Sequence, residues 1–262
     1  MERLSQPAPS VPPAVARQRN AILFALLALA AAGWYVVVRQ ATAPDTMGGG
    51  MMSGRPDLTM GSASLFFAMW VAMMVAMMFP SAAPMVLMYG RMRRSDPPSV
   101  ALFTASYIAL WFGFGAVAFA LGRLVEDRVT SSMWISENWT RGAGVLLIVA
   151  GIYQLTPLKD VCLRHCRTPL GFVMGYWRDG RTGAVRMGLR HGLYCVGCCW
   201  LLFLVLVPLG VMNIAAMIAV TLLVFAEKVL PWGRGVARAA ALALVVYGAL
   251  VVTRPELLPS AI

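Results

Sequence analysis

Charged residues are scarce in this sequence, and acidic residues are the scarcest of them. Only 13% of the 262 residues are Asp, Glu, Lys or Arg, and 11 are acidic, whereas an average soluble domain has about 25% charged residues. Hydrophobic residues make up 60% of the chain, which is more apolar surface than a soluble globule of this length can bury. These proportions exclude an ordinary soluble domain and predict an integral membrane protein.

Several enzyme motifs are also missing. The sequence has no glycine-rich nucleotide-binding loop, no nucleophile elbow and no paired-carboxylate site, and Ser, Asp and Glu are too sparse in the apolar segments for hydrolytic chemistry. No run of Lys and Arg is interleaved with aromatic residues, so the basic balance does not indicate nucleic acid as a partner. Binding or transport is therefore favoured over catalysis.

Seven apolar segments, each near the roughly 20 residues needed to cross a bilayer, predict an all-α polytopic membrane helix bundle of about seven transmembrane helices. Their approximate ranges are 21–38, 62–78, 100–121, 142–155, 192–209, 211–229 and 236–253. Residues 1–20, rich in Pro, Ala and Ser, are expected to form a disordered basic arm. Residues 21–262 are expected to form a single transmembrane domain. Whether the first span is retained or cleaved as a signal peptide stays open.

The net charge of +11 has a simple explanation in a membrane protein, because Lys and Arg accumulate in cytoplasmic segments. Sixteen of the 22 basic residues lie in the N-terminal arm or follow the second, fourth and sixth spans, and six lie in the alternate segments. This distribution predicts a cytoplasmic N-terminus. It also predicts that residues 158–190, which carry a Cys motif, form a cytoplasmic loop.

Methionine is unusually frequent, with 18 in the chain. Thioethers are soft ligands that suit Cu(I), and residues four apart stack on one helix face. The second span carries five methionines at such spacings: Met69, Met73, Met74, Met77 and Met78. Further methionines precede it in the predicted outer segment, at Met47, Met51, Met52 and Met60. The alternative is packing, because Met fills irregular gaps in apolar cores.

All five cysteines and both histidines lie within residues 162–199, a concentration that random placement would rarely produce. They are Cys162, His165, Cys166, His191, Cys195, Cys198 and Cys199. Thiolate and imidazole bind Cu(I) or Zn(II) well, and the predicted cytoplasmic location would keep the thiols reduced. An odd, clustered set disfavours a disulfide framework. The pattern therefore predicts a metal site, with Cu(I) as the first choice and Zn as the second.

Glu227 lies near the inner end of the sixth span. An acid inside a membrane helix indicates function, such as a counter-charge or a proton carrier. The alternative is an interfacial residue that reaches water beside Lys228.

These motifs resemble those of the DUF2182 family, which are bacterial predicted metal-binding integral membrane proteins. The matching stretches are MWVAMMVAMMFPSAAPM, CLRHCRTPLGF and the long segment that begins RMGLRHGLYCVGCCW. The likeness covers roughly residues 62–252. It implies a multi-pass protein of the bacterial inner membrane that binds metal, with copper indicated by some members, and it implies no established reaction.

The leading hypothesis is a protein that handles Cu(I), by transport or by delivery to a copper site under assembly. The expected partners are the lipid bilayer and a metallochaperone or a copper-dependent apoprotein. One alternative is a membrane thiol-disulfide oxidoreductase that uses Cys195 and Cys198, which form a CxxC pair. Another is a scaffold subunit with structural cysteines. The direction of transport and the oligomeric state stay open.

Overall fold

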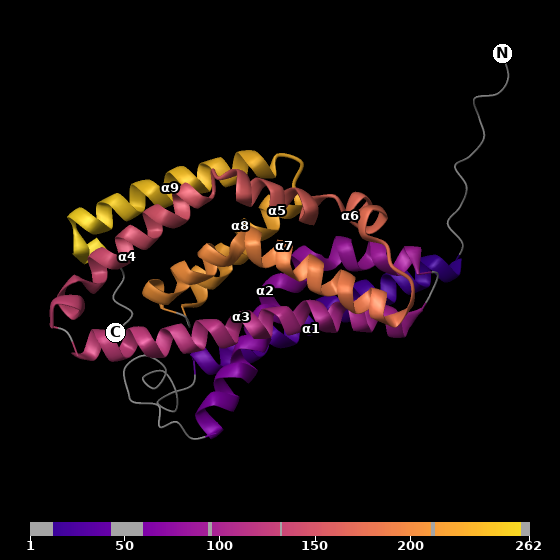
Figure 1. Ribbon diagram of the computed structural model, residues 1–262, viewed down its shortest axis with the longest axis horizontal. Coiled ribbons are helices and arrows are strands. Elements are labelled where there is room, and N and C mark those ends of the chain that lie inside the picture. Colours follow the sequence, from indigo (N-terminus) through magenta and orange to yellow (C-terminus); the bar gives the residue numbers. More distant parts are fainter. Residues whose placement is uncertain (1–12, 43–59, 94–95, 132, 211–212, 258–262) are drawn as a thin grey trace, which may run out of the picture.

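A computed structural model describes residues 13–42, 60–93, 96–131, 133–210 and 213–257. The regular structure within these ranges is entirely helical, and α7 and α8 run through the middle of the bundle (Figure 1). The elements, in chain order, are α1 (Pro13–Ala41), α2 (Met60–Met92), α3 (Pro97–Ser131), α4 (Met133–Tyr153), α5 (Pro157–Arg167), α6 (Pro169–Tyr176), α7 (Gly180–Leu209), α8 (Ile214–Val229), α9 (Gly233–Thr253) and a short 3-10 turn (Pro255–Leu257).

The prediction of an all-α polytopic membrane bundle is confirmed, and each of the seven predicted spans contains a helix. Five helices are long and apolar enough to cross a membrane: α1, α2, α3, α7 and α9. The pair α4 and α5, bent by 63°, makes a sixth span if it is counted as one unit. The seventh, α8, has 16 residues and is about 24 Å long, which is shorter than a hydrocarbon core of about 30 Å.

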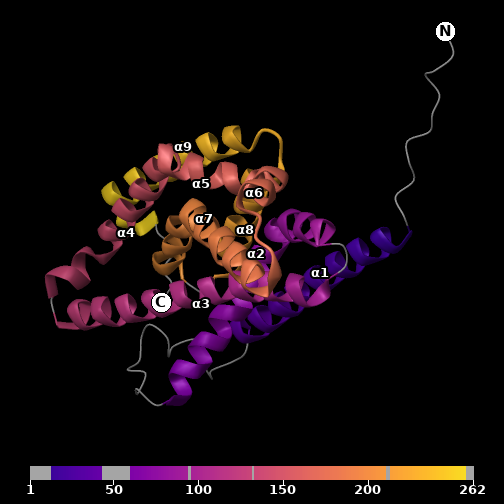
Figure 2. The same ribbon diagram turned by 45° about the vertical axis from the view of Figure 1, so that its right-hand side comes forward.

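The helices pack mainly in three close pairs. Helix α1 lies along α2, α3 lies along α7, and α4 lies along α9 at the edge of the bundle (Figures 1 and 2). Small residues permit the last contact, because a Cβ on Gly144 would lie 2.8 Å from the carbonyl oxygen of Gly248. Such close approach of backbones is how helices associate in lipid, where the hydrophobic effect does not drive their contact.

Helix α2 continues past the point at which the sequence predicts its end. Pro80 and Pro84 lie inside the helix, although each lacks the N–H that would bond one turn back. The Ser81 hydroxyl, between the two prolines, donates to the carbonyl oxygen of Met78 at 3.0 Å. This hydrogen bond lies in the middle of the bundle, beside the site described below.

Two other segments differ in detail from the expected layout. Helix α1 begins at Pro13, so residues 13–20 of the predicted basic arm are helical, and residues 1–12 lie outside the described part. The segment 158–190, expected as a loop, contains most of α5, all of α6 and the first three turns of α7. The outer methionines Met47, Met51 and Met52 are outside the described residues.

The close contact between α4 and α9 can be tested by a substitution that adds one methyl group to α4. We expect Gly144→Ala to lower the thermal unfolding temperature in detergent, because overpacking costs about 1–3 kcal/mol. The matched control is Gly142→Ala on the same helix, where a Cβ would meet nothing within 4 Å. Equal unfolding temperatures for the two variants would contradict this packing.

Candidate metal centre

All five cysteines lie along the contact between α5 and α7. Cys162 and Cys166 are one turn apart on α5, and both are buried. Cys195, Cys198 and Cys199 occupy the middle of α7 and are at most 1% exposed. All five are free thiols. Two helices that are separated in the chain thus bring their sulfur atoms into one interior region.

Local sequence explains why α5 begins where it does. The Thr156 hydroxyl accepts a hydrogen bond from the Lys159 N–H at 3.4 Å, and Pro157 occupies the first turn. A hydroxyl cap followed by proline is a standard helix start. Because α5 is amphipathic, residues spaced three or four apart share its buried face, and this face carries the two cysteines toward α7.

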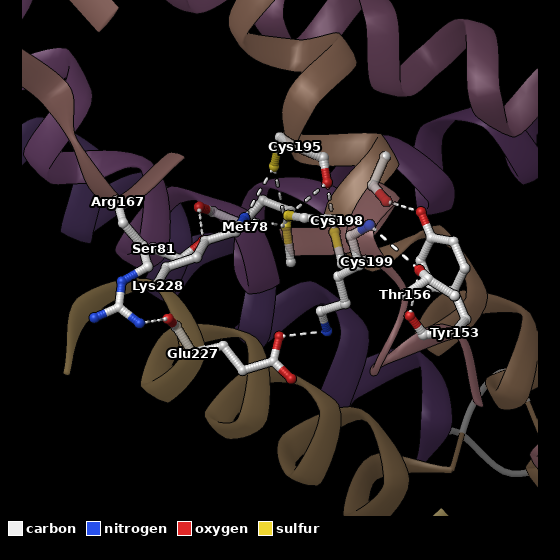
Figure 3. Close-up of polar contacts among 12 residues, drawn as sticks. Met78, Ser81, Tyr153, Thr156, Arg167, Cys195, Cys198, Cys199, Glu227 and Lys228 are labelled. Carbon is white, nitrogen blue, oxygen red and sulfur yellow. Dashed lines mark hydrogen bonds and ion pairs between the residues drawn. The ribbon is translucent and has the colours of Figure 1, made fainter. Parts of the chain in front are cut away.

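Cys195 is the centre of the cluster. Its sulfur lies 3.0 Å from the Lys228 Nζ and 4.0 Å from the Met78 thioether sulfur (Figure 3). The Tyr107 hydroxyl lies 3.1 Å from the same sulfur. These groups come from α8, α3 and α2, so four helices meet at this one atom. An ammonium group and a hydroxyl directed at sulfur are complementary to the negative charge of a thiolate.

Glycines on α7 allow this convergence. A Cβ at Gly188 would collide with the backbone of Phe103, and a Cβ at Gly192 would lie 2.8 Å from the Cδ2 atom of Leu110, which is also on α3. Because both positions lack a side chain, α3 approaches α7 closely. The Tyr107 ring therefore reaches the sulfur of Cys195, one turn further along α7.

The neighbouring thiols surround the Cys195 backbone. The Cys198 and Cys199 thiols donate to the Cys195 carbonyl oxygen at 3.1 and 2.8 Å (Figure 3). Cys166 lies one turn beyond Cys162 on the buried face of α5, and the Cys162 sulfur contacts α7 at Gly197, between Cys195 and Cys198. The two intrahelical hydrogen bonds are weak thiol contacts, so they present little obstacle to a metal ion that competes for the sulfur atoms.

His191 is a buried imidazole on α7, one helical turn before Cys195. It is 3% exposed, and neither of its ring nitrogens has a hydrogen-bond partner in the part of the chain that the structure describes. Its ring stacks on Tyr107 and makes a T-shaped contact with Phe172. Buried imidazole nitrogens normally have partners, so both unpaired nitrogens are consistent with a ligand position that is available for a metal ion.

Two predicted ligands lie apart from the centre of the cluster. The Cys162 sulfur packs against Gly197, where an added Cβ would lie 2.7 Å from it. His165 is on another face of α5, where its Nδ1 bonds the Val161 carbonyl oxygen at 2.8 Å. Its ring stacks on Tyr194 with 4.1 Å between centroids. Adjacent residues on a helix differ by about 100°, which separates His165 from the direction of its neighbour Cys166.

All five predicted methionines are buried in the main core, and three of them are completely inaccessible. They are Met69, Met73, Met74, Met77 and Met78. The Met78 thioether sulfur lies 4.0 Å from the Cys195 sulfur. The other four precede Met78 on α2 and pack within the same core.

Glu227 forms a buried ion pair rather than reaching water beside Lys228. Its carboxylate accepts from the Lys159 ammonium at 2.7 Å, and both side chains are 1% exposed. Next to this pair, the Arg167 guanidinium donates to the carbonyl oxygens of Glu227 and Leu230 at 3.2 and 2.7 Å. Both contacts tie α5 to the end of α8 (Figure 3), which positions Lys228 over the sulfur atoms.

The sequence analysis did not identify Lys228 and Tyr107 as site residues. Lys228 counts as one more positive charge on the predicted inner side, and Tyr107 is one aromatic residue in an apolar helix. The available signal was the presence of a lysine inside an apolar segment, directly after Glu227. An intramembrane charge of this kind indicates a partner, and here the partner of Lys228 is sulfur.

The donor set suits a soft ion. Within the described ranges, no three Cys, His, Asp or Glu side chains already form a ready metal site. The groups in this region are thiols, a thioether and an imidazole, and such donors suit soft ions such as Cu(I) better than hard cations. Small rotations of the Cys198 and Cys199 side chains, away from the Cys195 carbonyl, would redirect their sulfur atoms.

The fold and this site define a polytopic helical membrane protein with a buried cluster of soft sulfur donors. A family model described as PpoB2, a copper chaperone, matches residues 67–251. Because this match spans well over half of the chain, the protein belongs to the PpoB2 copper chaperone family and handles copper in a membrane. No curated protein and no solved structure matches the chain.

The buried ion pair should be essential for the attachment of α5. We expect Lys159→Met to destabilise the protein by about 3–5 kcal/mol, because it leaves the Glu227 carboxylate buried without a partner. The double variant Lys159→Met/Glu227→Leu should recover much of this loss. Thermal unfolding in detergent measures both effects.

The control is Asp160→Asn at the adjacent position, whose ion pairs with Arg164 and Arg234 are exposed. Exposed pairs contribute roughly 0–1 kcal/mol, so this variant should unfold near the wild-type temperature. A Lys159→Met variant as stable as Asp160→Asn would show that the buried pair does not hold α5 in place.

Proposed function

We propose that this chain binds Cu(I) at the buried sulfur cluster and delivers it to a copper-dependent apoprotein or a metallochaperone. The observation that carries the proposal is the contact of the Cys195 sulfur with Met78, Lys228 and Tyr107, in an interior where four helices meet. Cys198, Cys199 and His191 supply further donors within a turn of Cys195. The family match, which is to a copper chaperone, supports delivery more directly than net transport.

The monovalent ion is favoured by the ligand chemistry. Thiolates and thioethers are soft and prefer Cu(I), whereas divalent copper favours nitrogen and oxygen donors. Zn(II) is the second candidate, because it also accepts thiolate and imidazole ligands. The presence of the thioether of Met78 beside Cys195 favours copper, since Zn sites in proteins are built from Cys, His and carboxylates.

The other buried methionines suggest an approach to the cluster. Met69, Met73 and Met77 follow one another at four-residue steps on α2, ahead of Met78. We propose that these thioethers act as successive weak sites, from which the ion passes to the tighter thiolates. Such grading allows exchange of the metal ion without release into water.

The cellular setting follows from the sequence. The distribution of Lys and Arg supports a cytoplasmic N-terminus, and the likeness to the DUF2182 family supports the bacterial inner membrane as the location. In this orientation, α5 and α6 lie on the cytoplasmic side of the bundle. A cytoplasmic partner would therefore meet the protein near the cysteines of α5.

The oxidoreductase alternative is less well supported. Thiol–disulfide exchange requires access of a second disulfide to the attacking sulfur. Cys195 is completely buried, and the Cys198 thiol is directed at the backbone of its own helix. A purely structural role for the cysteines does not explain the unpaired nitrogens of His191 or the ammonium of Lys228 beside Cys195.

Copper content of purified variants tests the proposal. We expect the wild-type protein in detergent, reduced and titrated with Cu(I), to bind the ion, and Cys195→Ser to bind it at least about 100-fold more weakly, because the central ligand is lost. Competition with bicinchoninate measures the affinity. His165→Ala is the matched control, because this imidazole faces Tyr194 and should not affect copper.

Three results would contradict the proposal: no binding by the wild-type protein, equal binding by Cys195→Ser, or a mixed disulfide trapped by the serine variant. The last result would support the oxidoreductase alternative instead.

The role of the methionines can be separated from packing on one helix. Met78 and Met74 are both fully buried on α2, one turn apart, and a change to leucine conserves volume at both. We expect Met78→Leu to weaken Cu(I) binding by about 10- to 100-fold and Met74→Leu to leave it within a factor of about 3. Equal affinities would assign Met78 to packing alone.

A further inference from the structure

Lys228 places a cation among the sulfur donors. Its side chain is 7% exposed, and its Nζ lies 3.0 Å from the Cys195 sulfur, 4.0 Å from the Met78 sulfur and 3.4 Å from the Ser81 hydroxyl (Figure 3). Burial of an ammonium group away from water is costly unless an anion or polar partner is present. In this interior the sulfur of Cys195 is that partner.

Among the described residues, the other charged groups near the cluster have polar partners of their own. The Lys159 ammonium is paired with the Glu227 carboxylate at 2.7 Å. The Arg167 guanidinium donates to carbonyl oxygens at the end of α8, whose helix dipole favours a cation. Lys228 therefore adds one positive charge to the space in which the sulfur atoms meet.

We propose that Lys228 determines the charge of the metal ion that the cluster accepts, so that a monovalent ion is preferred to a divalent one. This inference rests on the proposed function of metal binding. It assigns Lys228 a role in specificity, although its ammonium donates no lone pair and cannot be a ligand. The residue acts through its fixed charge and its position.

Charge balance gives the physical reason. A Cu(I) ion held by two thiolates has a net charge of −1, and the ammonium of Lys228 brings the site to zero. A Zn(II) ion held by the same two thiolates is neutral, and the ammonium leaves the site at +1. A net charge in a low-dielectric interior is strongly disfavoured, so the lysine stabilises the first complex and destabilises the second.

The ratio of Cu(I) to Zn(II) affinity is the quantity that tests this role. We expect Lys228→Met to lower this ratio on the order of 100-fold, because the fixed ammonium charge repels a divalent ion more strongly than a monovalent one. Lys228→Arg keeps the charge and should retain the preference for Cu(I). The ratio is informative because the cost of deprotonating the thiols is common to both metals.

Each metal alone is the probe. Cu(I) is measured by competition with bicinchoninate under reducing conditions, and Zn(II) by competition with 4-(2-pyridylazo)resorcinol, on the full chain in detergent. Ser81→Ala is the uncharged control, because it removes a hydrogen-bond partner of Lys228 without altering the charge, and it should leave the ratio unchanged. Thermal unfolding of the metal-free variants shows whether each one is folded.

The outcomes separate this inference from the proposed function. If the wild-type protein binds neither metal, the proposed function fails. If it prefers Cu(I) and the ratio is the same for Lys228→Met, or falls equally for Lys228→Arg, the role of the charge is refuted while copper binding stands. Should Lys228→Met fail to fold, Lys228→Gln provides the neutral variant and is interpreted in the same way.

Discussion

The contact between α5 and α8 is the constraint on which the site depends. The buried ion pair of Lys159 and Glu227 joins two helices that are far apart in the chain, and the guanidinium of Arg167 binds the carbonyl groups that end α8. An ion pair in an apolar interior is retained only with good geometry, because desolvation of both charges is expensive. Its consequence is that α5 and α8 must approach α7 together, with cysteines on one and a lysine on the other.

The same interior explains the chemistry of the cluster. Thiols, a thioether and an imidazole are the donors that tolerate an apolar environment, since none needs the hydration of a carboxylate. Glycines at 188 and 192 let α3 place the Tyr107 hydroxyl against the Cys195 sulfur. The Met78 thioether belongs to α2, a helix that contains two prolines. Packing and ligand chemistry are thus built from the same residues.

Several site residues could be predicted because they lie on one helix. His191, Cys195 and Cys199 are spaced four apart, and Cys162 and Cys166 repeat this spacing, so each group must share a helix face. Proximity in sequence was not enough to identify a ligand at His165. This residue is adjacent to Cys166 in the chain, but its ring packs on Tyr194. Among the five methionines of α2, spacing alone did not distinguish Met78 from the others, since all of them are buried.

Composition and periodicity sufficed for the membrane bundle, because apolar segments near 20 residues have few other stable states. They also sufficed for the concentration of soft donors, which is a property of the chain and not of its packing. The tertiary structure decided which donors meet, because Cys195, Met78 and Lys228 belong to three helices and no local pattern relates their positions. It likewise decided that Glu227 pairs with Lys159 and not with water, since burial depends on which helix covers that face of α8.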